Sequence, residues 1–137
     1  MDRISRVALD WEDRIVGWVA GRPKRDGNVW ELHPLIVHDQ VRRQGIGSRL
    51  VADLEAQVFA RGGITVILGS DDTDKSTSLG GVDLYPNILE RAAAIENLRE
   101  HPFEFYQKQG YVITGVLPDA NGLGKPDIFM AKRVRTT

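Results

Sequence analysis

The most constraining feature of the sequence lies at residues 30–54, where a strand pattern leads through a basic, glycine-bearing turn into a helix pattern. The run Val29–Val37 is apolar and β-branched apart from Pro34, which predicts a strand. Apolar residues then recur on one helical face, at Ile46, Leu50, Val51, Leu54 and Val58. Such a unit aims free backbone N–H groups and the positive end of a helix dipole at one point. We therefore expect an anion site there, for a phosphate or a pyrophosphate.

The turn itself reads RRQGIG over residues 42–47. It is not a P-loop, because no Gly-Lys-Ser/Thr follows it, and Leu50 stands where a dinucleotide-binding turn has its third glycine. The remaining pattern, Arg/Gln-x-x-Gly-x-Gly, resembles the pyrophosphate-binding loop of the GCN5-related N-acetyltransferases. A helix start that merely contains two glycines and two solvated arginines would give the same letters, so the motif needs support from its flanks.

Composition limits the alternatives. With 137 residues, 42% hydrophobic and 27% charged, the chain is expected to form a single domain over residues 1–137. A net charge of −1 gives no reason to expect nucleic acid or an anionic membrane as partner. The absence of cysteine excludes disulfides, thiolate metal sites and a cysteine nucleophile, and we expect no metal. The charged N-terminus and the lack of a long apolar run predict neither a signal peptide nor a membrane span, so we expect a cytoplasmic protein.

The remaining pattern predicts an α/β architecture. An Asp-Gly pair at residues 26–27 favours a hairpin before Val29–Val37, so the first three strands should form an antiparallel meander. The helix should stop at Gly62-Gly63, and an apolar β-branched run after it should be a buried strand parallel to Val29–Val37. The other expected strands are 4–9, 14–20, 64–68, 111–117 and 127–134, and the expected helices are 46–61, 85–98 and 103–109.

Pro34 interrupts its strand and marks an edge or a bulge, because proline cannot donate to a ladder. A bulge would leave backbone groups unpaired beside the turn, where an extended amide-bearing ligand such as pantetheine could pair with them. An ordinary edge proline with hydrated neighbours is the alternative. Further on, Asp71, Asp72 and Asp74 follow the buried strand at its carboxyl end. They would attract a cation such as an amine, or they are a solvated turn with helix-capping acids.

A second motif supports the first. The segment Phe105-Tyr106-x-Lys108-x-Gly110-Tyr111 resembles another signature of the same acetyltransferase superfamily. Longer blocks resemble the aminoglycoside 6′-N-acetyltransferases, and in particular their chromosomal enterococcal type. These blocks are WELHPL at 30–35, LGSDD at 68–72, HPFEFY at 101–106, NG at 121–122 and KPDI at 125–128. The similarity extends from about residue 2 to residue 133.

The resemblance implies an acyl-CoA N-acyltransferase fold, with a mixed, splayed sheet flanked by helices, and acetyl-CoA as cosubstrate. It implies direct attack by the 6′-amine of an aminoglycoside, and a homodimer. The implied catalytic residues are Glu31, His33 and Tyr106. The implied cofactor-binding residues are Leu35, Ile36, Val37, Arg42, Arg43, Gln44, Gly45, Ile46, Gly47, Ser48 and Tyr106. The implied acceptor-binding residues are Glu31, Asp71, Asp72 and Asp127.

These roles are chemically reasonable. Glu31 precedes the expected bulge and could accept the amine proton or hold the ammonium group. His33 should face the same side by strand alternation and could share that role. Tyr106 could protonate the departing sulfur. Each residue could instead be structural: an outward-facing carboxylate, a hydrogen-bonded histidine or a half-buried aromatic.

Two departures from the family pattern qualify the acceptor. The family carries a further strand and two helices ahead of the segment that matches this chain, so we expect a shortened member, a fragment, or a site completed by a partner. Arg99 stands where the superfamily often has an asparagine. Acetylation of another small amine or peptide, and sequestration of aminoglycoside or CoA with little turnover, remain alternatives.

Overall fold

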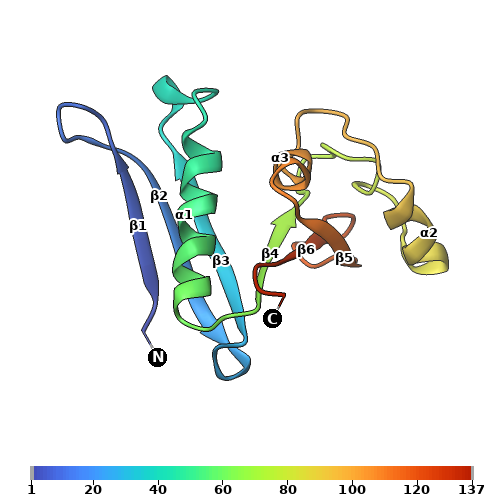
Figure 1. Cartoon of the computed structure of the whole chain (residues 1–137). Coiled ribbons are helices and arrows are strands. Elements are labelled where there is room, and N and C mark those ends of the chain that lie inside the picture. Colours follow the sequence, from blue (N-terminus) through green and yellow to red (C-terminus); the bar gives the residue numbers. More distant parts are fainter. Residues whose placement is uncertain (1, 137) are drawn as a thin grey trace. The chain divides into compact units, whose positions relative to one another are not determined.

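Three strands in the first forty residues build an antiparallel meander. Strands β1 (Ile4–Leu9), β2 (Ile15–Lys24) and β3 (Val29–Val37) pair in sequence order, β1 with β2 and β2 with β3. Buried positions alternate along β2 at Gly17, Val19 and Gly21 and along β3 at Trp30 and Leu32. In the computed structural model, which describes residues 2–136, six strands form one mixed sheet in the order β1-β2-β3-β4-β6-β5 (Figure 1). The predicted α/β fold with a mixed sheet is thereby confirmed.

The chain divides into two compact units. One consists of Met1–Ile67 with Arg133–Thr137, and the other of Leu68–Lys132. Strand β4 (Thr65–Asp71) contributes its first residues to the former and its last residues to the latter. The expectation of a single domain stays a prediction.

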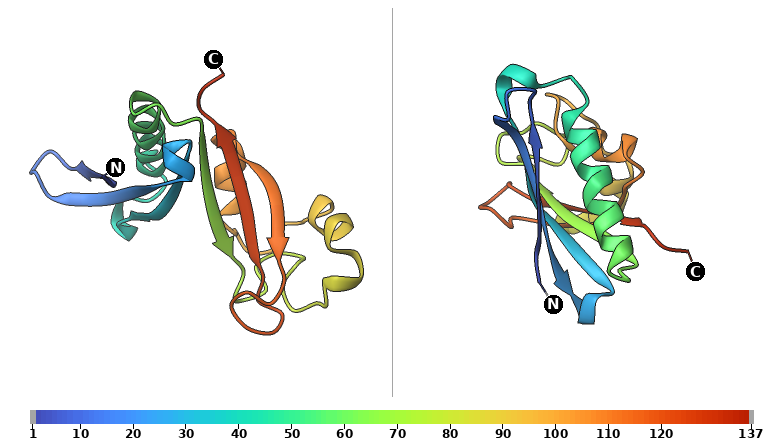
Figure 2. Two further views of the ribbon diagram at one scale, coloured as in Figure 1. Left: turned by 90° about the horizontal axis from the view of Figure 1, so that it is seen from below. Right: turned by 60° about the vertical axis from the view of Figure 1, so that its left-hand side comes forward.

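Helix α1 (Ile46–Ala60) covers one face of β1, β2 and β3, as the right-hand view of Figure 2 shows. Its apolar stripe, Leu50, Val51, Leu54 and Val58, is almost fully buried. Close approach to β2 requires Gly17, because a Cβ there would lie 2.8 Å from a methyl group of Leu50. Burial of this stripe is the main source of stability for a helix of such length.

The helix ends as its sequence predicts. Gly62 takes a left-handed conformation with φ +83°, and its N–H donates to Phe59 O at 3.0 Å. The N–H of Gly63 donates to Val58 O at 2.9 Å. These two bonds form a Schellman motif, which satisfies the last carbonyls of the helix and turns the chain into β4.

Strand β4 runs parallel to β3, as expected for a strand–helix–strand unit. Three residue pairs make up this ladder: Val29 with Thr65, Trp30 with Val66, and Glu31 with Ile67. Trp30 is fully buried, and its indole N–H donates to Gly27 O at 3.2 Å. The ladder partner of β3 beyond Glu31 is β2 alone, so one edge of β3 becomes free there.

The second unit is built on β4, β6 (Asp127–Arg133) and β5 (Val112–Leu117), which lie side by side in the left-hand view of Figure 2. Strands β5 and β6 are antiparallel. Helix α3 (Phe103–Lys108) precedes β5 and contributes buried Phe103 and Tyr106 to the core. None of the helices within residues 2–136 has the length and apolar character needed to cross a membrane.

The predicted helix at 85–98 is wrong in its second half. A 3-10 turn at Tyr85–Asn87 leads into α2 (Ile88–Ala93), and the helix ends there. The chain beyond it turns back: Leu98 N–H donates to Ser76 O at 2.8 Å, and Ser78 N–H donates to Glu96 O at 3.0 Å. Pairing with the loop after β4 replaces the helical bonds that the apolar spacing suggested.

Candidate active site

The N-terminus of α1 presents free backbone donors. Gly45 precedes the helix with φ +78°, and a Cβ at this position would meet nothing within 4 Å. Its carbonyl accepts the N–H of Arg49 at 3.1 Å. Within the described residues, the N–H groups of Gly45, Ile46 and Gly47 find no hydrogen-bond acceptor. Three free amides at the positive end of a fifteen-residue helix fit an anion such as a pyrophosphate.

The residues ahead of this helix add positive charge. A 3-10 turn at Asp39–Val41 is followed by Arg42, whose guanidinium lies 3.0 Å from the Asp39 carboxylate, and by Arg43, which has φ +67°. Both arginines and Gln44 are exposed, and Ser48 is half-buried in the first turn. Among the predicted phosphate-binding residues 42–48, Arg42 and Arg43 thus supply the positive charge, directly ahead of the helix.

The predicted bulge in β3 is present. Val19 of β2 pairs with Leu35, but Gly21 pairs with Leu32, so β3 has one additional residue at His33–Pro34. The peptide bond between these two residues is cis. The sequence signal of Pro34 therefore located a real irregularity in the ladder.

Beyond the bulge, β3 has a free edge. His38 N–H donates to Val16 O on β2 at 2.8 Å. Because successive backbone groups point to opposite sides of a strand, the amides of Leu35 and Val37 point away from β2. Ile36 stands opposite Trp18 and belongs to the β2 side. The edge offered by Leu35 and Val37 is available to an extended amide ligand.

Glu31 lies on β3 just before the bulge. Its Oε1 accepts a hydrogen bond from Arg22 Nε at 2.7 Å and lies 3.7 Å from Lys24 Nζ. Burial alone would raise the pKa of Glu31, but the Arg22 hydrogen bond and the charges of Arg22, Lys24 and His33 outweigh it and lower that pKa. Glu31 is therefore a carboxylate at neutral pH, and a weaker base than an unperturbed glutamate.

His33 has an exposed side chain. Its electrostatic influence on Glu31 agrees with the strand alternation that places both residues on one face of β3. Trp30 and Leu32 point to the other face, into the core. The first unit thus brings together Glu31, His33 and the free edge of β3.

Tyr106 belongs to the second unit and is 8% exposed. Its ring packs edge-on against Phe105 at 5.1 Å and Tyr111 at 5.8 Å between centroids. Burial raises the pKa of Tyr106 to about 12, so its phenol stays protonated over the neutral range. The hydroxyl forms no hydrogen bond with another described residue, and no fully buried polar side-chain atom of these residues lacks a partner. The hydroxyl therefore reaches the surface, where it can donate to a ligand.

The three acidic candidates differ sharply. Asp72 is 1% exposed, and it accepts hydrogen bonds from Thr77 Oγ1 at 2.7 Å and from the N–H groups of Ser76 and Thr77 at 2.9 Å. Its carboxylate organises the loop after β4, and we reassign it from acceptor binding to structure. Asp71 is exposed, and Asp127 is half-buried with its carboxylate over Gly69, where a Cβ would lie 2.8 Å from Oδ2.

His101 is a structural residue, as we expect for this histidine from the sequence. It is 4% exposed, its Nδ1 accepts from Phe103 N–H at 3.0 Å, and its Nε2 lies 2.8 Å from Asp71 O. This pattern requires the neutral tautomer with hydrogen on Nε2. The ring ties the start of α3 to the end of β4, from which Asp71 projects.

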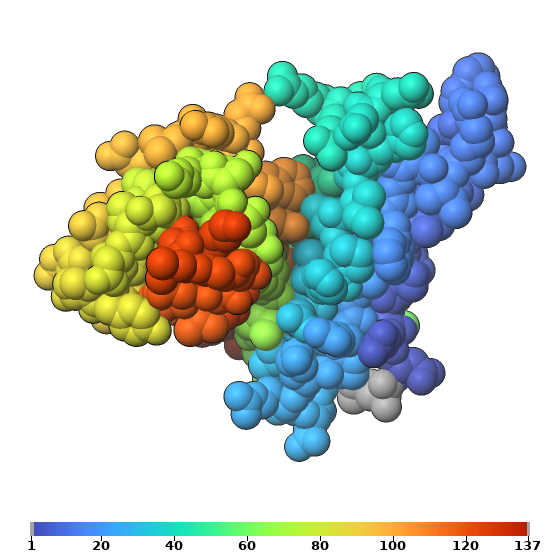
Figure 3. Space-filling model, turned by 180° about the vertical axis from the view of Figure 1, so that it is seen from behind, coloured from blue at the N-terminus to red at the C-terminus, as the bar shows by residue number. Residues whose placement is uncertain are grey.

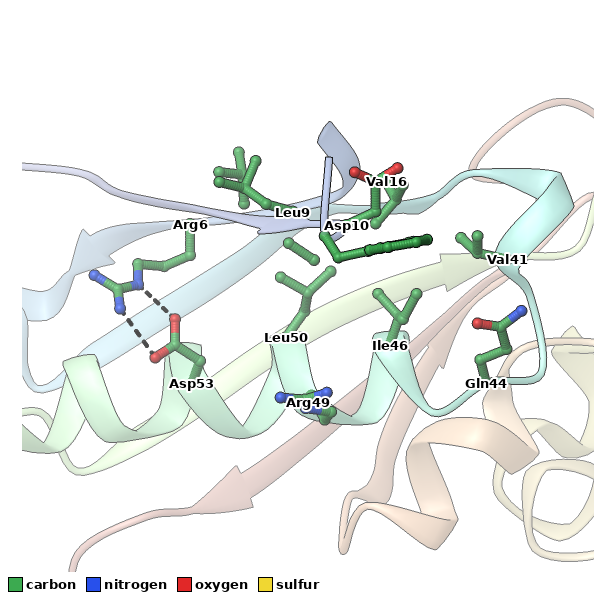
Figure 4. A pocket seen from close by; sticks show the side chains of 13 residues that line it. Arg6, Leu9, Asp10, Val16, Val41, Gln44, Ile46, Arg49, Leu50 and Asp53 are labelled. Atoms are coloured by element: carbon green, nitrogen blue, oxygen red, sulfur yellow. Dashed lines mark hydrogen bonds and ion pairs between the residues drawn. The ribbon is translucent and has the colours of Figure 1, made fainter. Parts of the chain in front are cut away.

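A cleft of about 600 Å³ lies between the β1–β2 hairpin and α1 (Figure 4). An ion pair between Arg6 and Asp53 closes one end, and Gln44 and Ile46 line the other. The hairpin tip at this cleft projects outward in the space-filling view (Figure 3). Glu31, His33 and the β3 edge do not line the cleft, so its only predicted site residues are Gln44 and Ile46 of the glycine turn.

Comparisons with known proteins agree with this geometry. A model of the acetyltransferase (GNAT) family matches residues 2–86. The chain belongs to this family. Among solved structures, it is 50% identical to an aminoglycoside 6′-N-acetyltransferase complexed with coenzyme A, with a TM-score of 0.96, covering 98% of this chain and 74% of that one.

Two further structures extend this result. The aminoglycoside 6′-N-acetyltransferase from Enterococcus faecium is also 50% identical, with a TM-score of 0.94 and coverage of 98% and 74% of the two chains. An aminoglycoside 6′-acetyltransferase type Ii is 41% identical, with a TM-score of 0.73 and coverage of 98% and 71%. No curated protein sequence gives a significant match. The resemblance stated from the sequence motifs is confirmed.

Proposed function

We propose that this protein transfers an acetyl group from acetyl-CoA to the 6′-amine of aminoglycosides. The observation that carries the proposal is the set of free amides at Gly45, Ile46 and Gly47, in a chain 50% identical to an aminoglycoside 6′-N-acetyltransferase complexed with coenzyme A. Acetyl-CoA, when bound, supplies an acetyl group activated as a thioester. The residues of this chain would hold acetyl-CoA, bind the amine, accept the amine proton and donate a proton to the departing sulfur.

The cosubstrate would be held at two places in the first unit. The amides of residues 45–47, with Arg42 and Arg43 beside them, suit a pyrophosphate. The free edge of β3 at Leu35 and Val37 suits the amide-bearing arm, and an amide there can also polarise a carbonyl oxygen. Both features come from consecutive elements, β3 and α1.

The acceptor amine would be drawn to carboxylates. Glu31 stays ionised because Arg22 lowers its pKa, which suits the binding of an ammonium group better than proton abstraction at neutral pH. His33 shares the face of Glu31, and an imidazole is the side chain that enzymes use most often as a general base. Asp71 and Asp127, which belong to the second unit, are further carboxylates that would attract a cationic amine.

Tyr106 would serve the leaving thiolate. A phenol that remains protonated up to a pKa of about 12 can donate a hydrogen bond or a proton to sulfur throughout the neutral range. Its surface hydroxyl has no partner in residues 2–136 to compete for that donation.

The test is release of free thiol from acetyl-CoA with an aminoglycoside that carries a 6′-amine, compared with one that carries a 6′-hydroxyl. We expect turnover only with the 6′-amine. An NMR titration with CoA should shift the amide signals of Gly45 and Gly47. Binding of both ligands without thiol release would identify a sequestering protein instead, and turnover with unrelated amines alone would reject the aminoglycoside.

A further inference from the structure

We infer that Arg22 is a positioning residue for the acceptor site: it holds Glu31 through one carboxylate oxygen and leaves the other oxygen for the incoming amine. Both basic contacts of Glu31, Arg22 Nε at 2.7 Å and Lys24 Nζ at 3.7 Å, fall on Oε1. Oε2 forms no hydrogen bond with the residues described. The inference rests on the proposed function, because it assigns Glu31 to the amine.

The pairing is produced by the bulge in β3. Uninterrupted pairing from Val19 and Leu35 would place Glu31 opposite Pro23, which has no charge to offer. The additional residue at His33–Pro34 shifts the register by one, so that Arg22 stands directly opposite Glu31. Directly opposed side chains project from the same face of an antiparallel pair and contact each other. Lys24, two residues further on, lies on the same face.

The arrangement affects orientation more than stability. The side chains of Arg22 and Glu31 are 47% and 25% exposed, and ion pairs of that exposure contribute little to folding. A charge-assisted bond at 2.7 Å nevertheless restricts the carboxylate to one orientation. With one oxygen anchored, the second has a defined direction in which an ammonium group can bind.

Arg22 also sets the charge of the site. Without it, the hydrogen bond and the charge that do most to lower the pKa of Glu31 are lost, so that pKa would rise from its wild-type value, with Lys24 and His33 still lowering it. If amine binding needs an ionised Glu31, the acid limb of the kcat/KM profile must then move to higher pH. A residue with only a structural role would lower kcat/KM without moving this limb.

The experiment compares R22Q, R22K and the matched control R14Q in the full chain. Arg14 forms an exposed ion pair with Asp10 at 2.9 Å in the hairpin turn, so its replacement removes the same charge elsewhere. Thiol release is measured across pH with a 6′-amino aminoglycoside, and CoA affinity is measured by calorimetry. Melting temperatures identify any variant that folds poorly.

We expect R22Q to lose about tenfold in kcat/KM, with its acid limb moved to higher pH and its CoA affinity unchanged. R22K keeps the charge without the planar guanidinium, so its acid limb should stay near that of wild type and part of the activity should return. R14Q should match wild type throughout.

Two results would overturn the inference and can be told apart. An active wild type with an R22Q profile superimposable on it would reject the role of Arg22 alone. Absence of thiol release from the wild type would reject the proposed function and this inference with it. If R22Q does not fold, R22K alone decides: an R22K acid limb moved clearly above that of wild type, although the positive charge is kept, would reject control by the Arg22 charge.

Discussion

The imidazole of His101 reaches back thirty residues to the carbonyl of Asp71, with Nε2 to oxygen at 2.8 Å. The same ring accepts the N–H of Phe103 on its other nitrogen. One neutral side chain therefore connects the last residue of β4 to the first residue of α3. The placement of Asp71 and of the helix that carries Tyr106 depends on this connection within the second unit.

Replacing His101 with alanine should destabilise the protein by about 2 kcal/mol, because two hydrogen bonds are lost and a buried space remains. Urea unfolding measures the change. The matched control is His38→Ala, since exposed His38 accepts a single bond from Gln40 N–H at 3.2 Å and should cost less. Equal losses for the two variants would contradict a connecting role for His101.

Gly45→Ala should weaken CoA binding and cost about 1 kcal/mol in stability, because alanine disfavours φ +78°. Gly62→Ala is a matched control: its φ is +83°, and a Cβ there would also meet nothing within 4 Å. Calorimetry with CoA and thermal unfolding separate the two effects. Both variants should lose stability, and only Gly45→Ala should lose affinity for CoA. Equal CoA affinity in the two variants would argue against binding of CoA by the glycine turn.

Asp72→Asn should destabilise the fold by about 2 kcal/mol, because an amide would direct a donor at groups that already donate to the carboxylate. Burial tends to raise the pKa of Asp72, but the bonds from Thr77, Ser76 and Asp74 lower it below its ordinary value. A lowered folded-state pKa stabilises the protein above the unfolded-state pKa, and this contribution disappears as pH falls through the folded-state pKa.

The stability gap between wild type and Asp72→Asn should therefore narrow below about pH 4. Chemical unfolding at a series of pH values measures it. The exposed neighbour provides the comparison, since Asp71→Asn should leave stability nearly unchanged at every pH. A gap that does not depend on pH would show that the charge of Asp72 is irrelevant to folding.

Tyr106→Phe should slow turnover by about a hundredfold while CoA affinity and stability change little, because the hydroxyl makes no hydrogen bond with the described residues. Since the pKa of Tyr106 is about 12, the wild-type rate should show no loss from this group up to about pH 10. Steady-state kinetics and calorimetry provide the data, with exposed Tyr85→Phe as control. Unchanged turnover in Tyr106→Phe would reject its role as acid.

Local pattern was enough to predict most of the framework. The strands at Ile4–Leu9 and Val29–Val37, the helix from Ile46 and its glycine stop follow from spacing, turn chemistry and capping. The sequence pattern gave a wrong helix where apolar residues at helical spacing are not buried in a core. Leu89 and Leu98 fit a helical stripe, but they are 77% and 57% exposed, and the segment after Ala93 pairs with residues 76–78 instead.

The same limit applies to the site. The glycine loop could be predicted because its residues are contiguous, whereas the Arg22–Glu31 pair depends on strand register, which a bulge shifts by one residue. Asp72 has the same charge as Asp71 one position earlier, and only the folded loop distinguishes the buried carboxylate from the exposed one. The residue type predicts which reactions a side chain could take part in, and the fold determines whether that side chain is exposed and which groups lie beside it.

The three-pair ladder between β3 and β4 has a consequence for how fast the backbone amides of β3 exchange with solvent. Beyond Glu31, the amides of Leu35 and Val37 face an edge where β4 offers no partner. Their hydrogens should exchange with deuterated solvent far faster than those of Trp30, and a ligand lying along the edge should slow them. Hydrogen–deuterium exchange would thus report, amide by amide, whether a ligand pairs with the free edge of β3.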